Sequence, residues 1–309
     1  MSRRAVTAVH GRRRLPGACY AFAPGVGVAP PEGTHPKGEE ETMERRAFLA
    51  ASTAAAVTTP HALGGEARAT EPGTGQRPRV LELRRYRLRN GALAARFAAY
   101  AKDALLPALG RAGLAPVGAW NVAVGPESPT VHLLIPHPDA DSVVTLAARL
   151  EADPDYGKAA STVLAVPATD PPFLSCDASL HAAVPTRPGV DKPTGAAAGK
   201  DRVFELRTYR SPTEAVSRRK IEMFEAGGEL ALFRRLGLDT VFFARDLVGG
   251  GLPSLTYMLV FADDAAREKG WAAFRDHPEW VKMRDDPRYA DTVSNIDSVL
   301  LRPTDYSQI

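Results

Sequence analysis

The stretch Val203–Tyr209 (VFELRTY) decides the fold of this chain, because its pattern occurs twice. Val80–Tyr86 (VLELRRY) carries the same pattern 123 residues earlier. Other paired motifs are separated by nearly the same number of residues, for example Gly113-Leu114 and Gly237-Leu238. A repeat of this length is too long for one unit of a solenoid and indicates a duplicated domain.

Each copy predicts the same order of elements. The two quoted stretches alternate in polarity without Gly or Pro and predict strands. A helical pattern, two strands, a second helix and a fourth strand follow in each copy. This β-α-β-β-α-β order predicts an α+β fold made of two tandem ferredoxin-like repeats with antiparallel sheets. The repeats cover residues 78–184 and 202–309, and residues 185–201, which contain three prolines and three glycines, form a linker.

Three local features refine this prediction. Pro107 predicts a kink in the first helix or a last turn that is split off from it. Pro136 predicts the end of a strand that begins at Thr130. Gly249-Gly250-Gly251 lies between two strands and lacks a following Lys-Ser/Thr, so we expect a hairpin turn and not a phosphate-binding loop.

The paired Glu-Leu-Arg-x-Tyr strands, the Gly-Leu after each first helix and the Trp271…Pro278-Glu279-Trp280 cluster together resemble the NIPSNAP family. The second repeat matches this pattern better, because the first has no counterpart of Trp271. The resemblance implies the fold of the dimeric α/β-barrel superfamily, in which two four-stranded sheets face each other and helices lie outside. Here the duplication could supply both sheets from one chain. The family has no agreed enzymatic activity, so the resemblance implies a fold more than a function.

The net charge of +3 resides in residues 1–69, which hold nine basic and six acidic residues, whereas the remainder has 30 of each sign. The folded part therefore lacks the basic footprint of a nucleic-acid-binding protein. Cys176 is the only cysteine outside residues 1–69, so we expect no intrachain disulfide once these residues are removed. We also expect a small buried side chain at this position.

Residues 43–69 resemble a twin-arginine export signal. Arg45-Arg46 precedes a short apolar run, and Ala67-Arg68-Ala69 provides a cleavage site near Ala69. The run is too short to span a bilayer, so we expect a periplasmic or extracellular protein without a stable membrane anchor. The alternative is an alanine-rich tail that exports nothing. Residues 1–42 lack periodicity and are expected to be disordered or an over-extended reading frame that truly starts at Met43.

The repeated strands carry the first candidate site. Their alternation puts the leucines under the helices and turns the polar side chains toward the barrel interior. The polar set could bind an anionic or phenolic molecule, or its charges could form an ion-pair ladder that joins the two sheets. Its members are Glu82, Arg84, Tyr86, Glu205, Arg207 and Tyr209.

The other candidates are weaker. His277 could be a catalytic acid/base group, but His-Pro-Glu is also typical of a helix start. Trp271 and Trp280 could stack on a ligand or simply pack in the core. His132 on a strand is either catalytic or structural, and His137 and His181 lie near strand ends where we expect them to face solvent. No cluster has zinc-like spacing, so no metal site is predicted.

These features predict an exported, cofactor-free protein that binds a small, partly apolar or aromatic molecule inside its barrel. One alternative is a cofactor-independent oxygenase or isomerase, as the superfamily resemblance implies, with His277 or His132 near Tyr209 or Tyr86. Another is a structural or interaction module with a filled barrel. A barrel closed within one chain would allow a monomer, and repeats that pair between chains would give a homo-oligomer.

Overall fold

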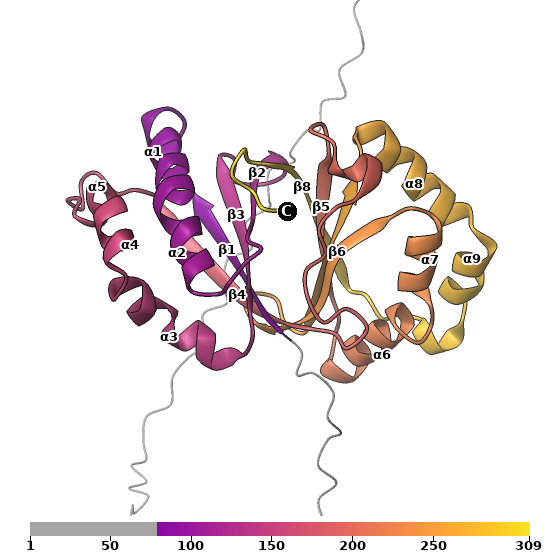
Figure 1. Cartoon of the computed structure of the whole chain (residues 1–309). Coiled ribbons are helices and arrows are strands. Elements are labelled where there is room, and N and C mark those ends of the chain that lie inside the picture. The colour runs from indigo at the N-terminus through magenta and orange to yellow at the C-terminus, as the bar shows by residue number, and fades with distance from the viewer. Residues whose placement is uncertain (1–78) are drawn as a thin grey trace, which may run out of the picture. The chain divides into compact units, whose positions relative to one another are not determined.

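The computed structural model describes residues 79–309 (Figure 1). The predicted start at Met43, the export signal and its cleavage near Ala69 lie outside the described residues. Among the described helices, none combines the length and the apolar character needed to cross a bilayer.

The first repeat follows the predicted order with two extra short helices before its last strand. Its elements are β1 (Val80–Arg87), α1 (Ala92–Tyr100), the π-helical turn η1 (Ala101–Leu105), α2 (Leu106–Arg111), β2 (Gly118–Val124), β3 (Thr130–His137), α3 (Ala140–Glu151), α4 (Pro154–Ala159), α5 (Ser161–Leu164) and β4 (Ser175–Ala183).

The second repeat has the same plan. A 3₁₀ turn in the linker, η2 (Gly195–Ala198), precedes it, and its elements are β5 (Val203–Arg210), α6 (Glu214–Phe224), α7 (Glu229–Arg235), β6 (Asp239–Val248), β7 (Ser254–Phe261), α8 (Asp264–Asp276), α9 (Pro278–Arg284), the 3₁₀ turn η3 (Pro287–Tyr289) and β8 (Asn295–Pro303).

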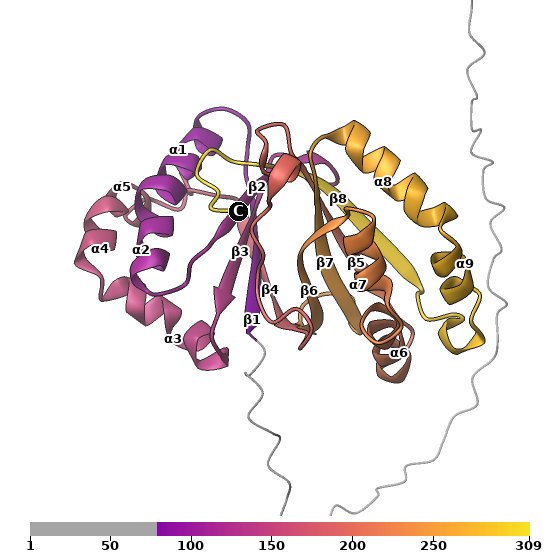
Figure 2. The ribbon, with the colours of Figure 1, turned by 45° about the vertical axis from the view of Figure 1, so that its right-hand side comes forward.

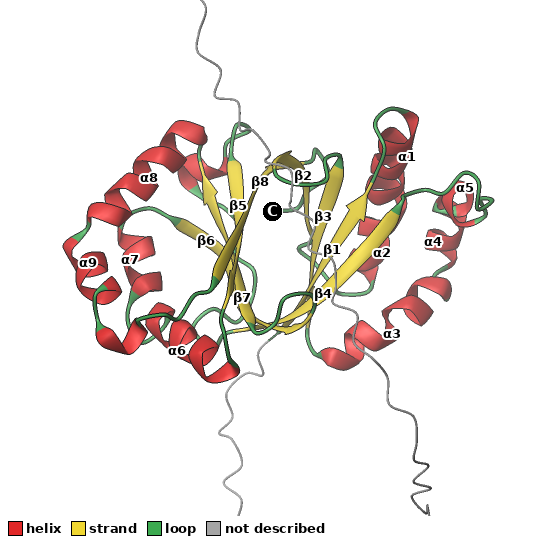
Figure 3. Ribbon diagram, turned by 180° about the vertical axis from the view of Figure 1, so that it is seen from behind, coloured by secondary structure: helices red, strands yellow, loops and turns green. Residues whose placement is uncertain are grey.

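All eight strands form one closed antiparallel barrel in the order β1-β3-β2-β8-β5-β7-β6-β4. The repeats meet at two seams, where β2 pairs with β8 and β4 pairs with β6. Helices α1–α5 cover one flank of the barrel and α6–α9 the other (Figures 1 and 2). Seen from behind, the strands form a continuous wall between the two helical layers (Figure 3). The tandem ferredoxin-like fold is thus confirmed, and one chain supplies both sheets.

Strand alternation divides the apolar residues into three cores. Two of them lie between the sheet and the helices, one in each repeat, around Phe97 and Phe233. The third fills one end of the barrel interior with side chains from both repeats, including Leu81, Trp120 and Phe204. Trp120 and Phe204 meet there edge to face at 5.3 Å between ring centroids.

Two local predictions need correction, and a third is confirmed. β3 continues through Pro136 to His137, because β2 stops pairing at Leu134 and leaves one side of the strand free where proline lacks its N–H. The irregularity predicted in the first helix is present, because the π-helical turn η1 separates α1 from α2 just before Pro107. Cys176 is exposed and not buried, because its side of β4 lacks a helical cover at this end.

Candidate functional site

The repeated polar side chains point away from the barrel interior, so the orientation predicted from sequence is wrong. Leu81 and Phe204 belong to the interior core, whereas Tyr86 and Tyr209 belong to the two cores beneath the helices. The physical reason is that apolar side chains fill the barrel interior at this end, whereas His137 and Arg267 on the outer side offer partners for the two carboxylates. Ligand binding by these residues stays a prediction, and the structure places them outside the barrel interior.

In the first repeat, the outward set is self-contained. Arg84 donates to both carboxylate oxygens of Glu82 at 2.7 and 3.1 Å and approaches the Tyr86 hydroxyl at 3.4 Å. His137, fully buried, lies 3.1 Å from Glu82 and 3.0 Å from Ser142, which corrects the expected exposure of this histidine. Burial raises the pKa of Glu82, but hydrogen bonds from His137 and Arg84 outweigh it and leave that pKa lowered.

In the second repeat, Glu205 has more partners. Its carboxylate accepts from Arg207 and Arg267 at 2.6 Å each, from the Trp271 indole at 2.7 Å and from Ser298 at 2.9 Å. Burial opposes ionisation, yet the bonds from Arg267, Trp271 and Arg207 hold the pKa of Glu205 below its usual value. Each charge is therefore satisfied inside its own repeat, and no ladder of these groups joins the two sheets.

The helix-borne candidates also have structural roles. The His277 side chain accepts the Glu279 amide at 3.2 Å and caps α9, as the helix-start interpretation predicts. Trp271 is buried against the sheet, and Trp280 packs on Phe274 at 4.5 Å between ring centroids. The structure does not bring His277 or His132 together with either tyrosine, which was the constellation expected for an oxygenase or isomerase.

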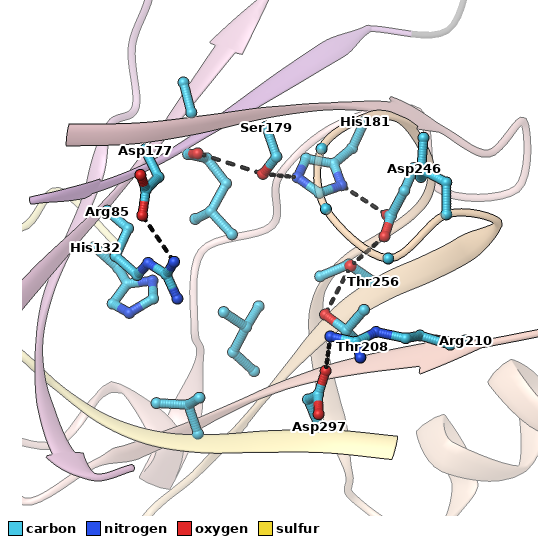
Figure 4. Close-up of a pocket in the computed structure, with 18 of the residues that line it drawn as sticks. Arg85, His132, Asp177, Ser179, His181, Thr208, Arg210, Asp246, Thr256 and Asp297 are labelled. Carbon is cyan, nitrogen blue, oxygen red and sulfur yellow. Dashed lines mark hydrogen bonds and ion pairs between the residues drawn. The ribbon is translucent and has the colours of Figure 1, made fainter. Parts of the chain in front are cut away.

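The open end of the barrel interior forms a pocket of about 710 Å³ (Figure 4). Its apolar lining comes from the inward positions of both repeats, among them Leu83, Leu206 and Val299. Exposed apolar side chains, Val248, Leu252 and Ile296, continue this surface outward. One end of the barrel interior is thus filled with side chains and the other end is hollow.

The charged groups of the pocket are paired with one another. Arg85 binds Asp177 at 2.8 Å, and Arg210 binds Asp297 at 2.6 Å (Figure 4). These four side chains are each between about a third and a half exposed, so the pairs contribute little to stability. Neither arginine of the pocket is therefore free to bind an anionic ligand.

His132 is the one sequence-predicted candidate that lines the pocket. Its side chain is nine-tenths or more buried, and its Nδ1 has no hydrogen-bond partner among the described residues. Burial, with a smaller effect from Arg85, lowers the pKa of His132 to about 4, so the ring is neutral at pH 7. This nitrogen is itself enclosed by the surrounding protein, so it does not present a hydrogen-bonding atom to the open pocket.

Sequence reasoning missed a second polar group on the pocket wall, made by Ser179, His181 and Asp246. The Ser179 hydroxyl lies 2.8 Å from Nε2 of His181, whose Nδ1 lies 2.7 Å from Asp246 (Figure 4). His181 is buried, which again corrects the expected exposure. Aligning the two repeats would have marked these three positions as polar where the other repeat is apolar, but not that they lie together.

Among residues 79–309, no three His, Cys, Asp or Glu side chains come together in a way that could hold a metal ion.

Comparison with known proteins gives one family. The NIPSNAP family model matches residues 81–166 and 204–308, which together are more than half of the chain. No curated protein matches the sequence.

Solved structures show similarity at low sequence identity. A NIPSNAP-like domain protein from Burkholderia xenovorans is 19% identical over 36% of this chain and 92% of its own, with a TM-score of 0.32. A NIPSNAP family protein from Agrobacterium tumefaciens strain C58 is 18% identical over 35% and 98%, with a TM-score of 0.31. An anthrone oxidase-like protein is 11% identical over 74% and 93%, with a TM-score of 0.44.

Proposed function

This chain belongs to the NIPSNAP family, and we propose that it binds a small, uncharged and partly apolar molecule in the open half of its barrel. The observation that carries the proposal is the pocket of about 710 Å³, because ligand-binding pockets typically measure about 300–1,000 Å³. A barrel that served only as a scaffold would be expected to fill this space with side chains, as it does at the other end.

The chemistry of the lining defines the ligand class. Leu83, Leu206 and Val299 offer apolar contact, and Ser179 offers a hydroxyl group on the wall. Because the arginines are already paired with carboxylates, a charged ligand would have to break an ion pair in order to bind. A neutral molecule with an apolar body and one or two polar atoms fits best.

The test uses Nile red, a neutral apolar dye whose fluorescence rises when it leaves water. We expect saturable binding to the wild type and at least a tenfold weaker affinity for Leu206→Trp, because the indole occupies the pocket. Val144→Trp is the matched control, since Val144 is 81% exposed on α3. Equal dye binding by both variants, or none by the folded wild type, would contradict the proposal.

Native mass spectrometry of protein purified from its own host provides the second test. A retained small molecule that is absent from the Leu206→Trp variant would identify the ligand directly. The same spectrum counts the subunits. We expect a monomer, because the barrel closes within one chain and leaves no unpaired strand edge among the described strands.

We infer export as a separate proposal, which rests on the Arg45-Arg46 motif and the Ala67–Ala69 site alone. The mature protein should begin near Thr70 when it is made in its own host. N-terminal sequencing checks this, and peptides from upstream of Met43 in the purified protein would contradict the expected start.

A further inference from the structure

We propose that Ser179, His181 and Asp246 form a nucleophilic triad that hydrolyses a small carboxylic ester held in the barrel pocket. The inference rests on the proposed ligand-binding function and adds a reaction to it. Three observations carry it: the hydrogen-bond geometry, the asymmetry between the two barrel seams, and the backbone that faces the serine.

The geometry is that of a nucleophile, a base and an orienting carboxylate. The Ser179 oxygen lies 2.8 Å from Nε2 of His181, and Nδ1 lies 2.7 Å from an oxygen of Asp246. A carboxylate only accepts, so Nδ1 carries the proton and Nε2 is left to accept from the Ser179 hydroxyl. The alternative acceptor for that hydroxyl, the Leu83 carbonyl, is farther away at 3.4 Å.

Local structure fixes these positions. Ser179 and His181 are two residues apart on β4 and therefore share the inward face, and His181 pairs directly with Asp246 of β6 next to an irregularity in the register. The second oxygen of Asp246 accepts from Ser254 at 2.6 Å and Thr256 at 2.9 Å. His181 and Asp246 are buried, whereas Ser179 is half-buried and lines the pocket where a substrate can reach it.

The second observation is an internal comparison. The β2–β8 seam is the counterpart of the β4–β6 seam, with the same type of register irregularity, and Val122 pairs with Leu301 where Asp246 pairs with His181. The repeat alignment also places Val299 where the first repeat has Ser179. One seam thus closes with three apolar residues, so closure of the barrel does not require the polar set at the other.

The third observation is the glycine turn between β6 and β7. A side chain at Gly249 would come within 3.1 Å of the Ser179 Cβ, so the backbone passes close to the serine. Gly250 and Gly251 also line the pocket, and their amides donate to no acceptor in residues 79–309. Free amides on the wall of the pocket are the kind of donor that can stabilise an oxyanion.

The reaction balances with water as the only co-reactant. The Ser179 oxygen attacks the ester carbonyl carbon while its proton passes to Nε2 of His181, and Asp246 stabilises the imidazolium through Nδ1. The tetrahedral intermediate expels the alcohol, which takes the proton from Nε2 and leaves an acyl ester on Ser179. Water then attacks this ester and gives a proton to Nε2. The carboxylic acid leaves, and the proton returns to the Ser179 oxygen.

The first experiment uses p-nitrophenyl butyrate and a fluorophosphonate probe on the full-length protein. We expect one probe per chain on Ser179, and turnover that falls at least 100-fold in Ser179→Ala. Ser175→Ala is the matched control, because Ser175 lies four residues away on the same strand and outside the pocket lining. No labelling of the folded wild type, or labelling and turnover that persist in Ser179→Ala, would overturn the triad.

Asp246 acts as a positioning residue, and Asp246→Asn tests it. We expect kcat to fall by about 10²–10⁴-fold with KM and the thermal midpoint unchanged, because the wrong imidazole tautomer is then favoured. A loss of activity that follows only from a lower thermal midpoint would assign the network to structure and overturn the triad.

Nile red separates the two proposals. Dye binding to the wild type and Ser179→Ala, without turnover by either, would overturn the triad and leave the binding function standing. Turnover that depends on Ser179, without dye binding in the barrel, would overturn the proposed neutral-ligand site and support the triad.

Discussion

The two seams of the barrel are built from equivalent strands and differ in what they hold. At the β2–β8 seam, Val122 and Leu301 pack in the interior core, whereas at the β4–β6 seam Asp246 and His181 hydrogen-bond beside an open pocket. The outward Glu-Arg-Tyr sets, by contrast, are alike in both repeats and are satisfied within them. The residues that the two repeats share stabilise the fold. The candidate site lies at positions where the repeats differ.

The largest expected effect concerns the shared scaffold. Glu205→Ala should lower the free energy of unfolding by about 3–5 kcal/mol, because the partly buried Arg207 and Arg267 and the buried Trp271 indole lose their carboxylate. Glu82→Ala should cost less, since fewer groups converge on that carboxylate. Urea unfolding measures both, with Glu279→Ala, at an exposed ion pair, as the control. Equal losses of stability at all three positions would contradict this prediction.

The second effect tests the asymmetry of the seams. Asp246→Val alone should cost about 3 kcal/mol, because His181, Ser254 and Thr256 lose their acceptor. The triple variant Ser179→Val/His181→Leu/Asp246→Val copies the three apolar residues of the other seam and should be more stable than Asp246→Val, because it removes the His181 donor that the single variant leaves unpaired. Urea unfolding again decides, and a triple variant less stable than the single one would show that the polar set is needed for closure.

A third effect concerns pH and the pocket histidine. The pKa of His132 is lowered to about 4 in the folded protein, below its usual 6.5, so the unfolded chain takes up the proton first as the pH falls. The stability that neutral His132 contributes is fully present above about pH 6.5 and is lost as the pH falls toward 4. Between pH 7 and pH 5 the wild type should lose about 2 kcal/mol more than His132→Gln. Parallel pH curves for the two proteins would contradict the assigned pKa.

The smallest effect is expected outside both seams. Cys176 is exposed on β4, so Cys176→Ser should change the free energy of unfolding by no more than about 0.5 kcal/mol. Ester turnover and Nile red affinity should stay within twofold of the wild type. Loss of turnover or of dye affinity in a folded Cys176→Ser variant would contradict this prediction and assign the thiol a role in the site.

The fold was largely predictable from sequence because strand alternation and the duplication are local signals. Val80–Tyr86 and Val203–Tyr209 predicted both β1 and β5, and Asp139 and Asp263 cap the helices that follow β3 and β7. The inward face was not predictable, because alternation says which residues share a side and not which side is hollow.

The candidate site was only partly predictable for a related reason. Of the sequence candidates, only His132 lines the pocket. Ser179 and His181 lie on β4 and Asp246 on β6, and only the pairing across the seam brings the three together. Such pairing between repeats follows from closure of the barrel, which the pattern within one repeat does not specify.

Closure through two inter-repeat seams also constrains how the protein can be made. β2 has no partner on its outer side until β8, the last strand in chain order, has been synthesised. The segment after β8 then bonds back to the start of β2, where Thr304 and Gln308 donate to Ala119 and Val117. During translation the first repeat therefore leaves the ribosome with two unpaired strand edges, and the barrel cannot close before β8 has been made. A truncation before β8 would leave β2 and β5 without a partner between them, so the barrel would stay open.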